Sequence, residues 1–508
     1  MSVNIPGLVV VVLFYLMVLG TGIWASVKSK RAQKDSHADR TEAALLGNRS
    51  ISLVVGVFTM TATFVGGGYI MGIAEVVYTP TMGLAWAVMP FTAAMSFIVG
   101  GLFFAKVMRD RKYVTMMDPI QIKYGNVIGG VLSVVLVIAD TVWVTATLIG
   151  LGATMSVILD LSYAFCIWIS AAVAIIYTLL GGLYSVAYTD VIQLILIFFS
   201  LWLSVPFMLM NPHSVDITKT AFNNTYQAPW IGTVEKERAW LWIDDVLILT
   251  LGNLGYQSFH QRTLSTSSPA AARITCFIAA PIIIIFGIPS LLIGAVAAST
   301  DWNMTSYGPL SPYEQAASIF TSNIYKNILR TQASDQELQW VIRVTMVLVG
   351  LAGTSLSFLQ KSIMLLWILG SGITYTIIFP QLFCALFFNI SNGYGSIMGI
   401  IVGVLLKVLS GDPSVGLPIV VHFPGCAVED GVYVQRAPVA TISMLSNIFA
   451  NLFFSYLASL LFNKSLIPGS SSFDLVVAVT LRVAEVFRAS RENKEVTSSS
   501  RMVVNRKQ

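Results

Sequence analysis

Charged residues are scarce in this chain, at 11% of 508 residues, whereas a soluble globular domain carries about a quarter. Apolar residues make up 56%, and they gather in runs near the ~20 residues that cross a hydrocarbon core. This composition excludes a set of soluble domains. The net charge of +5 forms no single basic patch, so nucleic acid is not an expected partner and membrane lipid is.

Cysteine and histidine are equally rare, with four of each. No CxxC pair suggests a disulfide framework or a metal site, and no HExxH spacing is present. GxSxG and GxxxxGK[ST] are also missing, so neither hydrolase nor ATP-driven pump chemistry is indicated. The sequence therefore predicts neither an enzyme nor an organic cofactor, and any driving force is expected to come from an ion gradient.

Twelve apolar runs are long enough to cross a bilayer. They lie near residues 6–26, 50–76, 83–107, 126–157, 163–185, 190–210, 239–258, 275–298, 340–359, 363–388, 394–410 and 437–462. Because lipid offers no partner to backbone amides, these runs must be helices. We expect an all-α membrane domain over 1–465 with a cytoplasmic tail over 466–508, and a first run that is retained as a span.

The basic loops predict the orientation of these spans. Basic residues follow the first and third runs, which places both loops in the cytoplasm and the N-terminus outside. The tail is also basic and is expected inside, so an odd number of spans is required although twelve are found. The misfit lies between Asp301 and Trp340, where the apolar stretch Ala316 to Phe320 is too short to cross. One helix is expected to be missing there.

Three sequons accompany this topology. Those at Asn223 and Asn303 fall in expected outer loops, and we expect glycosylation at both. The sequon at Asn48 lies on the cytoplasmic side of the scheme and is expected to stay unmodified.

Glycine interrupts the second and seventh runs, which read TMTATFVGGGY from Thr59 to Tyr69 and LGNLGYQ from Leu251 to Gln257. Exposed helix backbone survives in a bilayer only where it lines a cavity. The two runs lie five spans apart and so cross in opposite directions. Such a pair is a sequence pointer to a transporter binding site, and close helix packing through Gly68 and Gly72 is the plainer alternative.

Several carboxylates fall within or at the ends of apolar runs. They are Glu75, Asp140, Asp190, Asp244 and Asp245. A carboxylate at membrane depth marks an ion or substrate pathway by default, and Asp140, in mid-run, is the strongest candidate. For Asp190, Asp244 and Asp245 an N-terminal helix cap is the alternative.

Seven segments together resemble the sodium/solute symporter family, most closely its choline-carrying members. They are 181–193 (GGLYSVAYTDVIQ), 58–69 (FTMTATFVGGGY), 100–106 (GGLFFAK), 151–156 (LGATMS), 226–230 (YQAPW), 298–303 (ASTDWN) and 378–382 (IFPQL). The resemblance extends over residues 5–465. It implies thirteen helices in a five-plus-five inverted repeat, with repeats over about 50–210 and 239–410 and the second incomplete between 301 and 340. It also implies sodium-driven, chloride-dependent choline import at the plasma membrane.

The resemblance implies site residues as well. Sodium would be held by the backbone carbonyls of Phe58 and Thr61 and by Asp190. The substrate would be held at Gly67 and Gln257 and by an aromatic cage. Because the quaternary ammonium of choline has no N–H to donate, the cage must hold it by cation–π contact, worth about 0.5–2 kcal/mol per ring.

Phe64, Trp143 and Tyr256 are the expected cage walls. Trp86 is a further candidate, although its place near a membrane boundary favours an interfacial aromatic belt.

Two departures from the family pattern bear on function. Tryptophan stands in the family at the positions of Phe64 and Tyr256, and tyrosine at that of Ala93, so we expect weakened choline affinity or a different solute. The ninth helix of the family supplies serine ligands to sodium, and here Ser311–Phe320 runs directly into Thr321–Tyr325. Two hypotheses remain open: a sodium symporter, and a transport-deficient membrane protein that acts by assembly with other subunits, a homo-oligomer included.

Overall fold

Helices account for nearly all of the structure, as a bilayer requires of backbone amides. The computed structural model describes residues 46–159, 162–180, 183–210, 214–226, 228–300, 351–357, 362–411, 417–429 and 432–463, with scattered positions between 9 and 21. The missing-helix prediction between 301 and 340, most of the first run, the tail and Asn303 lie outside the described residues.

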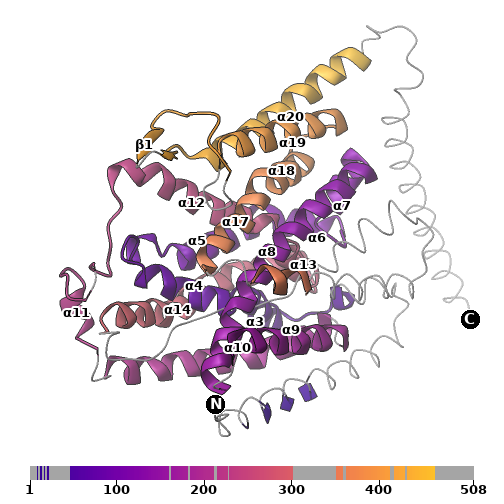
Figure 1. The fold of residues 1–508 in the computed structure, drawn as a ribbon. Coiled ribbons are helices and arrows are strands. Elements are labelled where there is room, and N and C mark those ends of the chain that lie inside the picture. Colours follow the sequence, from indigo (N-terminus) through magenta and orange to yellow (C-terminus); the bar gives the residue numbers. More distant parts are fainter. Residues whose placement is uncertain are drawn as a thin grey trace, which may run out of the picture.

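The first half of the chain forms a series of helices, one of which contains a π-helical segment (Figure 1). They are η1 (Gly47–Arg49), α3 (Leu53–Phe64), α4 (Gly67–Tyr78), η2 (Leu84–Trp86), α5 (Met89–Val99), the π-helix η3 (Gly100–Phe104), α6 (Ala105–Asp110), α7 (Asp118–Tyr124), α8 (Asn126–Leu159), α9 (Tyr163–Leu180) and α10 (Leu183–Leu209).

The second half of the chain is also mainly helical. It comprises α11 (Ile217–Thr220), η4 (Lys236–Arg238), α12 (Ala239–Leu251), η5 (Gly252–Gly255), α13 (Gln257–Leu264), α14 (Pro269–Ala298), α17 (Ile363–Ile373), the π-helix η8 (Thr374–Ile378), α18 (Phe379–Phe387), α19 (Gly393–Leu409), the hairpin β1 (Ala427–Glu429) and β2 (Val432–Val434), and α20 (Val439–Asn463).

Within the described residues, six helices are long and apolar enough to span a membrane, or seven if the bent pair α3 and α4 forms one span. These helices coincide with the apolar runs of the sequence, with one informative shift. Helix α10 begins at Leu183, not near 190. Asp190 therefore lies inside α10, and the interpretation that it caps this helix is wrong.

Both glycine-interrupted runs are broken helices, as predicted. Helices α3 and α4 meet at 49°, and Gly66 between them is extended, with φ −108° and ψ −177°. Helix α12 ends in the 3₁₀ turn η5, after which Tyr256 is extended (φ −94°, ψ 138°) and α13 begins.

Contacts between loops sort the helix ends into two groups. At one end, Arg49 Nη2 donates to the carbonyl of Lys112 over 2.8 Å, and Arg109 Nε donates to the carbonyl of Thr266 over 3.1 Å. At the other end, the amide of Leu84 donates to the carbonyl of Trp230 over 2.8 Å. Arg49 and the basic loop after the third run thus lie together at one end, and the loop over 228–238 lies at the opposite end.

Helices α19 and α20 pack along a stripe of glycines (Figure 1). A Cβ built on Gly395 would lie 1.9 Å from Ser455 Oγ and 2.1 Å from the Asn451 carbonyl oxygen. Such close approach lets polar side chains bond across helices. Gln381 Nε2, from α18, donates to Asn447 Oδ1 over 2.7 Å, and Asn451 Nδ2 donates to Gln381 Oε1 over 2.9 Å.

Candidate functional site

A buried aromatic cluster lies where the two broken helices approach α8. The ring of Trp143, on α8, is 5.9 Å from that of Phe64 at the end of α3 and 4.8 Å from that of Tyr256 before α13. Both contacts are edge-to-face. The three predicted cage residues are therefore brought together, although they are far apart in the sequence.

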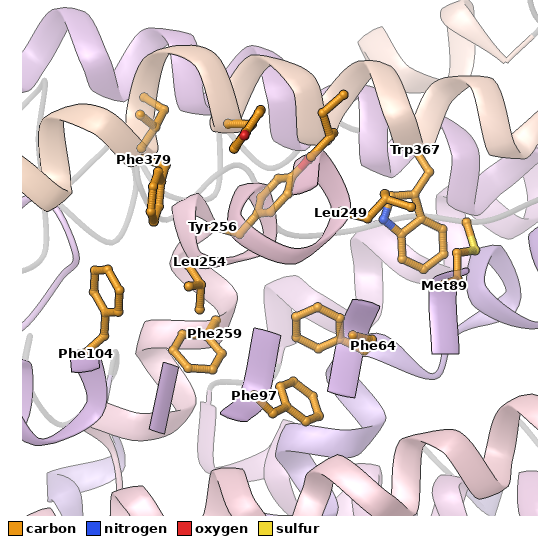
Figure 2. Close-up of a cluster of buried hydrophobic side chains, with 14 of the residues drawn as sticks. Phe64, Met89, Phe97, Phe104, Leu249, Leu254, Tyr256, Phe259, Trp367 and Phe379 are labelled. Atoms are coloured by element: carbon orange, nitrogen blue, oxygen red, sulfur yellow. The ribbon is translucent and has the colours of Figure 1, made fainter. Parts of the chain in front are cut away.

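A fourth aromatic residue completes the cluster, and the sequence reading missed it. Trp367, on α17, packs its ring 5.5 Å from that of Trp143 and 6.3 Å from that of Tyr69. Figure 2 shows Trp367, Tyr256 and Phe64 in one cluster, each from a different helix. Trp367 stands in the middle of an apolar run, where pattern alone cannot tell a site residue from a core residue.

The cluster continues away from the breaks into ordinary core packing. Phe97, on α5, stands 5.0 Å edge-to-face from Phe64 and 6.4 Å from Phe259 of α13. Ala93 lies one turn before Phe97 and is also buried. Its methyl group provides no ring at this position of the cluster.

Trp86 does not lie in an interfacial belt, and that interpretation is wrong. Its side chain is only 5% exposed. Its Nε1 donates to the carbonyl of Thr233 over 3.2 Å, and the guanidinium of Arg238 lies 4.6 Å from the ring centre. The 228–238 loop therefore covers Trp86 and supplies both a hydrogen-bond acceptor and a cation to its indole ring.

The two remaining predicted substrate residues have different surroundings. Gly67 is the first residue of α4, directly after the break. Gln257 begins α13, and its Oε1 accepts from the backbone amide of Met116 over 2.8 Å. Gln257 therefore joins the second broken helix to the loop before α7, a structural contact that the sequence pattern did not indicate.

Helix α7 ties the same loop to α18. The ammonium of Lys123 donates to the carbonyls of Ala385, at 3.2 Å, and of Phe388, at the C-terminal end of α18. A cation is favourable at the negative end of a helix. Burial lowers the pKa of Lys123, so the carbonyl contacts do not fully replace the water lost around the ammonium.

The predicted sodium residues meet around α3. Asp190 accepts a hydrogen bond from Thr59 Oγ1, and its carboxylate lies 3.3 Å from Arg262 Nη2 of α13. Arg262 Nε in turn donates to Thr63 Oγ1 over 2.8 Å. Arg262 is almost fully buried, so this pair balances two charges that would otherwise be costly to bury.

Phe58 and Thr61 both lie inside α3. The carbonyl of Thr61 accepts from the amide of Val65 over 2.9 Å, which is the last helical bond before the break. A carbonyl has a second lone pair, so this bond leaves Thr61 able to contact a cation.

Two of the membrane-depth carboxylates are helix caps. Glu75, on α4, accepts from Ser362 Oγ over 2.6 Å and from the amide of Ile363 over 3.0 Å, at the start of α17. Asp244, on α12, accepts from the amides of Ala440 and Thr441 over 2.9 and 2.8 Å, at the start of α20.

Each of these carboxylates thus satisfies helix N-terminal amides of another element. The prediction that Asp244 caps its own helix is therefore wrong, because it caps α20 instead. This contact favours a structural role for Asp244 over a role in an ion or substrate pathway.

Asp140 differs from both. It is 2% exposed on α8, and its Oδ2 has no hydrogen-bond partner among the described residues.

Asn223, the predicted glycosylation site, is exposed in the loop after α11. Its Nδ2 donates to the carbonyl of Lys219 over 3.0 Å.

Comparison with known proteins shows which family this chain belongs to. Residues 45–301 and 311–403 match the model of the sodium:solute symporter family. The chain belongs to that family. Like its relatives, this sodium:solute symporter is a multi-span membrane protein.

Curated relatives align with between 70% and 98% of this symporter. A high-affinity choline transporter of Torpedo marmorata is 44% identical over 94% of this chain and 90% of its own length. The high affinity choline transporter 1 of Homo sapiens is 41% identical over 98% of this chain and 91% of its own length. A sodium/proline symporter of Salmonella typhimurium is 23% identical over 70% of this chain and 78% of its own length.

A solved structure confirms the fold class. A Na⁺-coupled sialic acid symporter in a substrate-bound outward-open state superposes with a TM-score of 0.66 at 15% identity, covering 89% of this chain and 98% of that one. At this identity the likeness concerns the fold, an all-α sodium symporter architecture.

Proposed function

We propose that this chain is a sodium-coupled, chloride-dependent symporter that imports choline or a related small organic cation across the plasma membrane. One observation carries the proposal: Phe64 and Tyr256, one from each broken helix, both contact Trp143. A site at two helix breaks can open to either side of the membrane, which is the basis of alternating access.

The ring faces suit a cation that cannot donate an N–H. Phe64, Trp143 and Tyr256 supply cation–π surfaces in a buried setting where water does not compete. Phenylalanine and tyrosine are weaker surfaces than tryptophan. The names of two curated relatives, both choline transporters, suggest choline as the substrate, and the altered cage walls favour lower affinity for it.

Sodium coupling follows from family membership and from the polar residues around α3. Thr59 donates directly to Asp190 there, and Arg262 links Asp190 to Thr63. We assign sodium to this part of α3, with the carbonyls of Phe58 and Thr61 and the Asp190 carboxylate as ligands. Sodium binding would then compete with Arg262 for Asp190.

The two groups of helix ends support the orientation. The end that carries Arg49, Arg109 and Lys112 is basic and would face the cytoplasm. The opposite end carries the 228–238 loop and the sequon at Asn223, and would face outside with the N-terminus. The C-terminus would then be cytoplasmic.

Uptake of labelled choline into cells or vesicles tests the proposal. We expect uptake that disappears when sodium is replaced by an organic cation and that falls when chloride is replaced by gluconate. Uptake that is unchanged in both replacements would contradict sodium and chloride coupling.

A second candidate function is that of a transport-deficient partner that assembles with intact subunits. The alignment with the human transporter runs over 540 positions, whereas this chain has 508 residues, so part of that relative has no counterpart here. Failure of this chain to transport alone, with altered uptake when an intact transporter is co-expressed, would favour this candidate. Reading the transcript around Ser318 and Phe320 for an in-frame segment tests the same idea.

A further inference from the structure

Asp140 is the mid-span carboxylate whose role the contacts described above leave open. It lies near the middle of the candidate span Asn126–Gly152. Its side chain is 2% exposed, and its Oδ2 has no hydrogen-bond partner among the described residues. An uncompensated carboxylate in such a place is costly and is kept where an ion or substrate needs it.

Three other carboxylates within the apolar runs have partners in the structure. Glu75 and Asp244 accept hydrogen bonds from helix N-termini, and Asp190 pairs with Arg262. No Lys, Arg or His of the described chain forms an ion pair with Asp140. Among the described residues, Asp140 is therefore left without the positive partner that the other carboxylates have.

Asp140 borders the aromatic cluster. It precedes Trp143 by three residues on α8, which places both side chains on one face of the helix. It also lies close enough to Tyr256 to interact with it electrostatically. A Cβ built on Gly370 would lie 2.9 Å from the Tyr256 hydroxyl and 3.3 Å from the Ala139 carbonyl oxygen, so α8, α17 and Tyr256 converge at this point.

We propose that the Asp140 carboxylate is the countercharge of the organic cation bound at the Phe64–Trp143–Tyr256 cluster. This inference rests on the proposed function and specifies the substrate class as a small onium ion. Sodium fits this position less well, because it requires a shell of several oxygens, whereas the neighbours here are mainly ring faces.

Trp367 adds a second element of the substrate class. Its indole Nε1 is buried and has no hydrogen-bond acceptor among the described residues, while its ring packs on Trp143. An unpaired donor beside a cation site suits a solute that also carries an acceptor oxygen. The site is thus suited to an onium ion with a hydroxyl or ether oxygen.

The variant Asp140→Asn tests the countercharge with little change of shape. Equilibrium binding is measured on the purified full chain in lipid nanodiscs with two probes, choline and its neutral carbon analogue 3,3-dimethylbutan-1-ol. We expect choline affinity to fall about 10- to 100-fold, the range for a hydrogen bond or ion pair to a charged group. The affinity for the neutral analogue should change by less than about threefold.

Asp245→Asn is the matched control, because it removes the same charge from α12, where its charged neighbours are Asp244, Arg238 and Lys407. It should leave the ratio of the two affinities unchanged. Each of three results for Asp140→Asn would overturn the proposal: an unchanged ratio, an equal loss of both probes, or a shift confined to the sodium dependence of choline binding.

Failure of the proposed function gives a different result. If the unsubstituted chain binds neither probe, choline is not the solute and both proposals fall. If it takes up choline with sodium and the ratio is unchanged in Asp140→Asn, only the role of Asp140 falls.

Discussion

Removal of the Asp244 side chain should separate α20 from α12. The carboxylate accepts hydrogen bonds from the amides of Ala440 and Thr441, and a third of 2.5 Å from Thr441 Oγ1. Asp244→Ala would leave two buried amides of the first turn of α20 without an acceptor. Loss of a helix cap costs about 0.5–2 kcal/mol, and hydrogen bonds to a charged group about 1.5–3 kcal/mol each.

Because the three bonds share one carboxylate, their contributions do not simply add, and we expect a loss of roughly 2–4 kcal/mol for Asp244→Ala. Asp244→Asn keeps one acceptor oxygen and should cost about half as much. Thermal unfolding of the detergent-purified protein should therefore rank the Tm values as wild type, then Asn, then Ala. Asp245→Ala serves as the control, because this neighbour does not cap α20. Equal Tm values for Asp244→Ala and Asp245→Ala would refute the capping of α20 by Asp244.

Three further predictions follow from the site and the packing. The double substitution Phe64→Trp and Tyr256→Trp should tighten choline binding by about tenfold, because tryptophan is the better cation–π surface. Asp190→Asn should destabilise the protein by roughly 3–5 kcal/mol, since it leaves Arg262 buried without a countercharge, and adding Arg262→Gln should recover part of that loss. Gly395→Ala should prevent the close approach of α19 and α20 and lower the yield of folded protein in size-exclusion chromatography.

For each of these three predictions, a control variant or a specific result can contradict the reasoning. Trp86→Phe, outside the cluster, should leave choline affinity as it is, and unchanged binding in the double tryptophan variant would remove the cage assignment. If Arg262→Gln deepens the effect of Asp190→Asn, the two side chains do not act as a pair. Gly372→Ala has open space for its Cβ and should fold normally, so equal behaviour of Gly395→Ala would disprove the steric argument.

The helices and their breaks could be predicted because lipid leaves the backbone few options. Apolar runs must be helical, and glycine within them marks the breaks, as at Gly66 and Gly252. The start of α10 was placed too late because its first turns contain Tyr184, Tyr188 and Asp190, which lower the apparent apolarity of a helical segment.

Contacts between distant segments could not be predicted in the same way. The sequence shows that Glu75 and Asp244 are buried carboxylates, but their partners lie almost 200 residues or more away in the chain. Trp86 looked like a boundary residue because sequence position does not reveal that Arg238 covers it. Trp367 was missed because one more aromatic residue in an apolar run carries no distinguishing signal.

The contact between Glu75 and the start of α17 has a consequence for motion. It fastens the half of the first broken helix that follows the break to the helix that carries Trp367. Any tilting of α4 about Gly66 must therefore carry α17 along, and with it one wall of the aromatic cluster. A change at the α3–α4 break would then be coupled to a change in the position of Trp367 against Trp143.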